Sequence, residues 1–231
     1  MPVGLLGKKL GQTRVYDSKG AASCVTVVLA GPNRVLQCKT EQSDGYNSVQ
    51  LGFDDQKEHR VTKALLGHIK KFNGAPVKRV KEFRNFSKEV KPGDVIGATL
   101  FAPGDYVDAI GVTKGRGFEG VVGRHSFRGG DSTHGAKGWH RRSGAIGQRL
   151  FPGTVMRGMR MPGHMGQVRR TAQNLEVIQV REAENVLLIR GAIPGSKGDY
   201  VIIRESKKRP KGWRPHAERA AEAKKGEAKK K

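Results

Sequence analysis

The chain has 231 residues and a formal charge of +23, from 44 lysines and arginines against 21 aspartates and glutamates. This length suits one core with an appended smaller part. The charge favours a polyanionic partner, because each neutralised phosphate releases counterions.

Other classes of protein are excluded by what the sequence lacks. No stretch approaches the roughly 20 apolar residues of a membrane-spanning helix, and no signal-peptide h-region follows Met1. Cys24 and Cys38 have neither zinc-ligand spacing nor the density of a disulfide scaffold. We expect a reduced, soluble, intracellular protein without a membrane partner. An anionic membrane surface is the rival to nucleic acid.

The N-terminal part predicts short β-strands. Four runs have strand character: 4–16, 24–29, 34–38 and 46–53. Turn signals at 17–20, 31–33 and 43–45 separate them. Short strands with turns between them indicate a barrel or a sandwich.

Residues 54–73 change to a basic, helical pattern, with Val61, Leu65, Ile69 and Phe72 roughly on one face. Gly67 predicts one broken helix or two short ones. Three further strands are expected after this segment: 77–86, 95–100 and 106–112.

The next segment, 114–170, has an unusual composition. Its fifty-seven residues include fourteen glycines, twelve lysines and arginines, four histidines and two acids. Past Val122 no apolar period of 2 or 3.6 is sustained, so no regular element is predicted there. An irregular loop of this length is normally functional or disordered.

Strand patterns resume at 174–180, 185–190 and 199–204, so the long loop interrupts a β-domain. We predict a barrel domain from 1–113 plus 171–204, with a helical insertion at about 54–73. The extension 114–170 is inserted in it, and 205–231 is a basic, low-complexity tail without a fold of its own. Within the tail, 215–223 is the part whose composition allows a helix.

Four histidines and Asp131 raise the possibility of a nuclease or metal site. His134 and His140 are six residues apart among glycines, which is not the rigid spacing that zinc requires. The fingerprint-like run 115–120 has no helix-forming run after it, and no paired carboxylates or nucleophile elbow is present. We therefore predict no catalytic residues, no metal and no cofactor, and histidines that bond to or stack on nucleic acid.

The basic residues of the extension point to RNA. Glycines allow the backbone to approach phosphates and sugars closely, and Phe127, Trp139 and Phe151 could stack on unpaired bases. No helix-turn-helix, finger or basic zipper is present to enter a DNA major groove. The methionines among these arginines could instead fill an apolar groove, and the tail's charge could simply be solvated. We predict RNA contacts from Lys114, Arg116, Arg124, His125, Arg128, His134, Lys137, Trp139, His140, Arg141, Arg142, Gln148, Arg149, Arg157, Arg160, His164, Arg169 and Arg170.

The sequence resembles the L3 family of large-subunit ribosomal proteins, of the bacterial type. The family's signature spacing is matched by Phe101, Asp108, Gly111, Thr113, Gly115-Arg116-Gly117, Gly120 and Arg124. Further similar stretches are 4–16, 33–35, 44–46, 60–63, 133–135, 152–153 and 191–195. The resemblance covers about residues 2–204.

The resemblance implies a mainly β fold: a closed six-stranded barrel similar to the second domain of translation factors, on the outer face of the ribosome. It implies an extension that threads into large-subunit rRNA, with its tip at 147–151 near the peptidyl-transferase centre. It also implies rRNA binding near the 3′ end early in assembly, neighbouring ribosomal proteins as partners, no small-molecule substrate, and a cytoplasmic location in the ribosome. Fully extended, twenty residues out and twenty back reach on the order of 60 Å.

Two departures from the family pattern stand out. Some bacterial members carry a methylated glutamine two positions after a Gly-Gln pair, where this chain has Leu150, so that modification is not expected. The tail has no counterpart in the short members of the family.

Two alternative functions stay open from the residues alone. One is an extraribosomal RNA chaperone or translation-factor-like protein that binds RNA through its barrel. The other is an enzyme that cleaves or modifies RNA with His134, His140 and Asp131.

Overall fold

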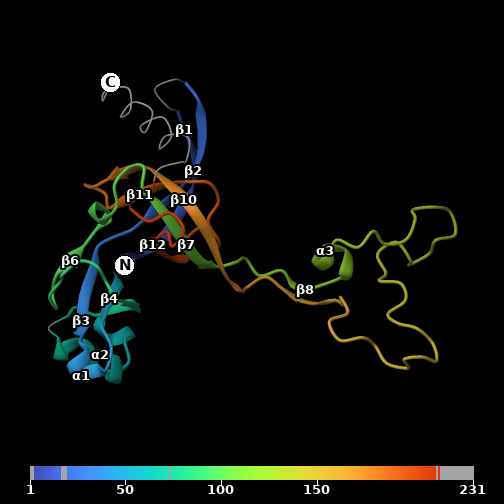
Figure 1. The fold of residues 1–231 in the computed structure, drawn as a ribbon, viewed down its shortest axis with the longest axis horizontal. Helices are drawn as coiled ribbons and strands as arrows, with labels where there is room; N and C mark the ends of the chain where they lie inside the picture. The colour runs from blue at the N-terminus through green and yellow to red at the C-terminus, as the bar shows by residue number, and fades with distance from the viewer. Residues whose placement is uncertain (1–2, 17–19, 73, 212, 214–231) are drawn as a thin grey trace, which may run out of the picture. The chain divides into compact units, whose positions relative to one another are not determined.

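A computed structural model describes residues 3–16, 20–72, 74–211 and 213 (Figure 1). They form two compact units: the described residues up to Val112 together with those from Arg170 onward, and Thr113–Arg169. Two predictions fall largely outside the described residues. These are the turn at 17–20, of which only Gly20 is described, and the helix at 215–223.

The first unit contains a closed antiparallel barrel of six strands (Figure 1). Around the barrel their order is β1 (Gly4–Tyr16), β12 (Tyr200–Glu205), β7 (Tyr106–Val112), β10 (Arg169–Arg181), β11 (Val186–Arg190) and β2 (Ala22–Leu29). The long strand β1 closes the barrel, because its first residues pair with β12 and the rest pair with β2. A bulge between Lys9 and Gly11 lies at this change of partner. The prediction of a closed six-stranded barrel is confirmed.

A second sheet of four strands belongs to the same unit. Its order is β5 (Val77–Arg84), β4 (Ser48–Asp55), β3 (Asn33–Lys39) and β6 (Val95–Ile96). The sequence predicted these strands but did not indicate that they form a sheet of their own. The strand expected over 95–100 was wrong in its second half, which is a 3-10 helix, η2 (Ala98–Leu100). Asn185 Oδ1 accepts a hydrogen bond from Ala98 N at 3.4 Å, so a side chain takes the place of a partner strand.

The helical insertion consists of η1 (Glu58–Arg60) and α2 (Lys63–Lys71), as the prediction of one broken helix or two short ones allowed. The break was expected at Gly67 and lies instead at Val61 and Thr62, whereas Gly67 is inside α2. A further short helix, α1 (Glu41–Asp44), joins β3 to β4. Ile69 of α2 is fully buried against Leu36 and Val77 of the four-stranded sheet.

One hydrophobic core joins the barrel to the four-stranded sheet. Leu5, Val107 and Ile203 of the barrel pack in the same buried cluster as Val35 and Leu51 of the sheet. Strand β11 has apolar side chains on both faces because both are covered. Leu187 and Ile189 enter this core, whereas Val186 and Leu188 pack with Val25 in a second cluster. Alternation of two apolar faces explains why β11 reads as a continuous apolar run.

Buried polar side chains tie the chain's turns to this core. Asn33 is fully buried, accepts a hydrogen bond from Leu6 N at 3.1 Å and donates to Leu6 O and Ala30 O, each at 3.0 Å. Its amide thus bonds to the backbone of β1 as a neighbouring strand would. All its hydrogen-bonding groups are satisfied, which burial in a core requires.

Candidate nucleic-acid interface

The second unit, Thr113–Arg169, begins as two legs joined by hydrogen bonds. β8 (Gly117–Glu119) pairs antiparallel with β9 (Gly163–Met165), and Thr113 N donates to Val168 O at 3.0 Å. Gly166 lies where the two legs approach each other closely. Its φ is +78°, and a Cβ there would be 2.1 Å from Lys114 O, so only glycine permits this approach.

A short helix, α3 (Val121–His125), follows β8 and is held by the returning leg. Arg124 Nη1 donates to Met161 O at 2.7 Å, and His125 Nε2 lies 3.1 Å from the same oxygen. The prediction of no regular element past Val122 was therefore wrong, since α3 continues to His125 and β9 lies at Gly163–Met165. α3 has only five residues and β9 only three. The hydrogen bonds that hold α3 join it to Met161, which is 36 and 37 residues away in the sequence. Local periodicity cannot show such contacts.

Beyond α3 the chain folds back on itself at a pair of glycines. Gly130 N donates to His140 O at 3.2 Å, and a Cβ at Gly129 would be 2.2 Å from that oxygen. The Arg142 guanidinium lies 4.8 Å from the centroid of the Trp139 ring. A cavity of about 310 Å³ is lined by these side chains with Phe127 and Arg128. A stacked indole and guanidinium beside a hollow suit the planar faces of unpaired bases.

The segment 144–160 is irregular, and every residue in it is exposed. Leu150 and Phe151 are 89% and 87% exposed, and Met156 is 59% exposed. Adjacent exposed apolar side chains are typical of a surface that binds a partner. Sequence reasoning missed one such residue, Phe118 of β8, which is 79% exposed opposite His164. Its position in a Gly-Arg-Gly-Phe run was the available signal.

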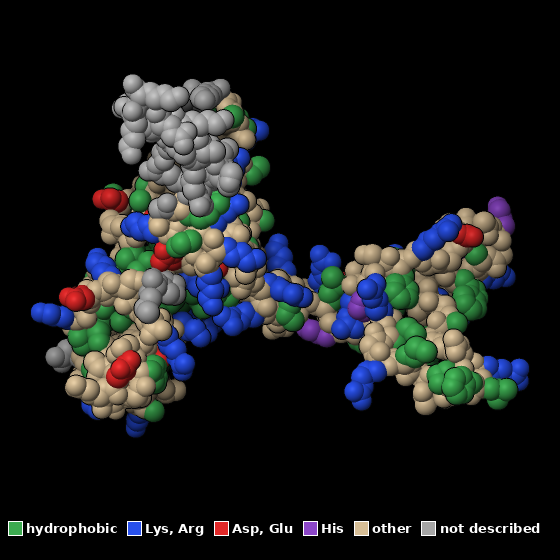
Figure 2. Space-filling view, in the orientation of Figure 1, with side chains coloured by type: hydrophobic (Ala, Val, Ile, Leu, Met, Phe, Trp, Pro, Cys, Tyr) green, Lys and Arg blue, Asp and Glu red, His purple; other side chains and the backbone are tan. Residues whose placement is uncertain are grey.

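The residues predicted to contact RNA are spread over the unit, with Arg170 just beyond its end, rather than gathered in one cleft. Figure 2 shows lysines and arginines along the whole unit. His125 is half-buried. All the others are exposed: Lys114, Arg116, Arg124, Arg128, His134, Lys137, Trp139, His140, Arg141, Arg142, Gln148, Arg149, Arg157, Arg160, His164, Arg169 and Arg170.

The charges of these residues are almost unpaired. Arg128 and Asp131 form one ion pair at 3.4 Å, with side chains 91% and 76% exposed, so solvent screens it strongly. No other lysine or arginine between 114 and 170 forms an ion pair within the described residues. The unit is thus a polycation whose counter-charges are not in the described chain.

The described residues give little support to the catalytic alternative. His134 and His140 are exposed, and Asp131 pairs with Arg128. Among the described positions, no group of three or more His, Cys, Asp or Glu could hold a metal ion. In the same part of the chain, no helix is long and apolar enough to cross a membrane.

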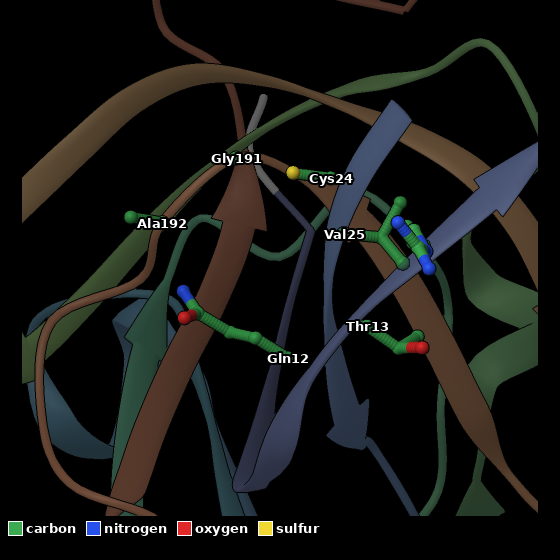
Figure 3. Close-up of a pocket in the computed structure, with 7 residues that line it drawn as sticks. Gln12, Thr13, Cys24, Val25, Gly191 and Ala192 are labelled. Carbon is green, nitrogen blue, oxygen red and sulfur yellow. The ribbon is translucent and has the colours of Figure 1, made fainter. Parts of the chain in front are cut away.

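An open pocket of about 520 Å³ lies in the first unit, between β1, β2 and the turn after β11 (Figure 3). It is lined by Gln12, Thr13, Arg14, Cys24, Val25, Gly191 and Ala192. The side chain of Gln12 already donates to Thr26 Oγ1 at 3.4 Å, and Thr26 donates to Gly191 O at 2.6 Å. One cation, Arg14, is among the lining residues, and none of the described lining residues is a carboxylate.

Comparisons with known proteins agree with the resemblance in the sequence. The sequence profile of the family described as ribosomal protein L3 matches residues 55–187. The large ribosomal subunit protein uL3 of Deinococcus radiodurans is 47% identical over 205 residues, which cover 89% of this chain and 95% of that protein. The uL3 proteins of Akkermansia muciniphila and Nitrosococcus oceani are each 46% identical, over 212 and 211 residues. Those two matches cover 90% of this chain and 100% and 98% of the relatives.

Proposed function

The chain belongs to the ribosomal protein L3 family, and we propose that it is a structural constituent of the large ribosomal subunit that binds large-subunit rRNA directly. The main support for this proposal is the exposure and the charge of the second unit. Its cations are exposed and nearly unpaired. Where two of its segments meet, glycines leave no side chain between the two backbones. A polyanion with many closely spaced phosphates matches this arrangement, because each neutralised phosphate adds affinity.

The geometry also favours RNA over a protein partner. Val121 is the one buried hydrophobic side chain in the described residues 113–169, so this unit has almost no core of its own. Apolar and aromatic side chains alternate with arginines along it, as stacking on unpaired bases and contact with phosphates require. The core that this segment lacks would then be supplied by rRNA, which offsets the entropy of ordering it.

In this proposal the unit is the family's RNA-threading extension. Residues 147–151 form its tip and approach the peptidyl-transferase centre, which the protein braces without catalytic residues of its own. Binding takes place near the 3′ end of the large rRNA, early in subunit assembly, beside neighbouring ribosomal proteins in the cytoplasm. The exposure of Leu150 and Phe151 supports a tip that is covered only after assembly.

The proposal is tested by replacing three predicted RNA contacts, as Arg141→Gln, Arg149→Gln and Arg160→Gln together. The matched control carries the same change in charge on the first unit, at the exposed Lys81, Lys88 and Lys91. We expect the wild-type chain and the control to co-sediment with large subunits and to resist a moderate salt wash, and the arginine variant to be lost. Against an rRNA transcript, the variant's slope of log K against log salt should fall by about 2.

The proposal is contradicted if the two triple variants behave alike. It also fails if the wild-type chain is found only in free fractions after gentle lysis. RNA binding that survives the arginine replacements and instead requires the barrel would support the extraribosomal alternative. A cross-linking map from positions 141, 149 and 160 would identify the RNA contacts.

A further inference from the structure

The first residues of the basic tail lie against the barrel. We call Ser206–Trp213, with its described residues 206–211 and 213, the tail root. The Arg209 guanidinium lies 4.8 Å from the ring centroid of Tyr106 at the start of β7, and 4.3 Å from that of Trp213. The two rings are 5.4 Å apart and nearly perpendicular, at 87°. Arg209 thus packs against two rings that also contact each other, one from the barrel and one from the tail.

Hydrogen bonds fix the backbone of the tail root as well. Ser206 is 2% exposed, its N donates to Tyr106 O at 3.0 Å, and its hydroxyl donates to Asn174 Oδ1 at 2.6 Å. The same hydroxyl accepts a hydrogen bond from Arg209 N at 3.2 Å. Lys211 N donates to Glu205 Oε1 at 2.7 Å. A segment that composition alone assigns to a low-complexity tail is therefore seated on the barrel at several points.

The cations of the tail root differ in their surroundings. Arg209 is half-buried, and its guanidinium faces two rings. Lys211 lines a small hollow together with Asp105 and Glu205, and its backbone N donates to Glu205. Lys207 and Lys208 are exposed, and their side chains have no partner within the described residues. Two adjacent cations are thus presented from a fixed backbone.

We propose that the tail root is a second RNA-binding element of this protein, in which the Tyr106–Arg209–Trp213 stack positions Lys207 and Lys208 against RNA phosphates. It is separate from Thr113–Arg169, and it rests on the proposed function only in taking RNA as the partner. Fixing the backbone in advance reduces the entropy lost when these two side chains bind.

Charge and composition favour RNA over an acidic protein surface. Trp213, the one aromatic side chain of the tail root, packs against Tyr106 and Arg209. The exposed part of the tail root therefore offers point charges without the apolar centre of a specific protein interface. Point charges on a fixed backbone suit phosphate contacts, which carry no sequence information. The sequence after the tail root also has a positive net charge, because 214–231 has seven lysines and arginines against three glutamates.

The first experiment uses the full chain and a large-subunit rRNA transcript. Lys207→Gln with Lys208→Gln is compared with Lys88→Gln and Lys91→Gln, two exposed lysines of the same unit. We expect the slope of log K against log salt to fall by about 1.4 to 1.8 for the tail-root pair, as for two lost phosphate contacts. The control should keep the wild-type slope. Equal slopes for the two double variants overturn the proposal.

The same measurement in a chain that also carries the three arginine replacements keeps the two proposals apart. If the arginine variant binds like wild type, the proposed function of the extension fails, whatever the tail root does. If the tail-root pair leaves the slope unchanged but prevents entry into large subunits, its partner is a protein and the RNA proposal is wrong.

A second experiment tests the positioning role of the stack with both lysines intact. Trp213→Ala should weaken RNA binding several-fold, whereas Trp213→Phe, which keeps a ring for the guanidinium, should restore it. Trp139 and Trp213 are the two tryptophans of the chain, so Trp139→Phe leaves Trp213 as the sole indole fluorophore. In that background Arg209→Gln should increase acrylamide quenching. Wild-type RNA affinity in Trp213→Ala would refute the positioning role.

Discussion

The carboxylate of Asp108 and the guanidinium of Arg204 form an ion pair across neighbouring strands of the barrel, with Oδ2 and Nη2 3.2 Å apart. The Asp108 side chain is 1% exposed and that of Arg204 is 24% exposed. Asp108 Oδ1 also accepts a hydrogen bond from Asn174 N at 3.1 Å, at a position of β10 with φ +57°. One carboxylate therefore joins β7, β12 and β10. A residue recognised in the sequence as part of a family signature has a structural role.

Replacing Asp108 with Asn should destabilise the first unit by about 2 to 3 kcal/mol, because it leaves Arg204 without its counter-charge. Arg204 Nε is already buried with no hydrogen-bond partner in the described structure, so the carboxylate is the main compensation for this charge. Urea unfolding measures the effect. Glu176→Gln is the control, because its pair with Arg190 is 32% and 59% exposed and should contribute less than about 1 kcal/mol. Equal losses in the two variants would contradict this account.

Replacing Lys9 with Met should loosen the turn after β11. The Lys9 side chain is largely buried, and its Nζ donates to Ile193 O at 2.7 Å and to Gly195 O at 2.9 Å. Methionine fills a similar volume but leaves both carbonyls without this donor, at a cost of about 1 to 3 kcal/mol. Urea unfolding gives the loss, and amide exchange at 193–198 should speed up. Lys8→Met, at a side chain that is 35% exposed, should change both measurements little.

The pair of Glu82 and Lys39 predicts a loss of stability in acid. Burial alone would raise the pKa of the Glu82 carboxyl, but its hydrogen bonds, above all from Lys39 at 3.0 Å, outweigh burial and lower the pKa. Because the pKa of Glu82 is lower in the folded protein than in the unfolded chain, the ionised carboxylate stabilises the fold. This stabilisation is complete above the unfolded pKa of about 4.3 and is lost as pH falls through the folded pKa.

The measurement is the difference in unfolding free energy between wild type and Glu82→Gln as a function of pH. We expect this difference, at most about 1 kcal/mol, to be constant near neutral pH and to shrink below about pH 4.3. The control is Glu58→Gln. Glu58 pairs with Lys70 at the surface, where both side chains are more than half exposed, so its difference should be smaller throughout. A difference that grows in acid would have the wrong sign.

Replacing Gly166 with Ala should separate the two legs of the extension, because the added Cβ would be 2.1 Å from Lys114 O. We expect a large drop in the share of the protein that enters large subunits. Gly144→Ala is the matched control: its φ of +75° is similarly strained for alanine, but no atom lies within 4 Å of its Cβ. If both variants enter subunits equally, the close approach of the legs is not required for assembly.

The extension should be sensitive to protease in the free protein and protected by RNA. Every residue from 144 to 160 is exposed, including Arg149, Arg157 and Arg160. We expect trypsin to cut there first, and an rRNA transcript to slow those cuts much more than cuts at Arg181 and Lys197 of the first unit. Equal protection of both regions would mean that the RNA does not bind the extension in particular.

The sequence by itself determined the strands, the polycationic extension and the family, because each depends on local composition or on a fixed spacing of residues. Alternating apolar residues predicted most strands. The position of the interruption in the helical insertion was not predicted, because Gly67 lies inside α2 and the break is at Val61 and Thr62. The excess of arginine and glycine in 114–170 predicted a polyanionic partner without any coordinates.

Only the tertiary structure decided how these parts are joined. It assigned β3, β4, β5 and β6 to a sheet outside the barrel, ended the strand at Ile96, and held α3 through Met161. It also placed Arg209 against both Tyr106 and Trp213, in a segment whose composition predicted no fold. The long-range contacts among these join residues 36 to 103 positions apart. No window of sequence contains both partners, so their physical cause exists only in the folded chain.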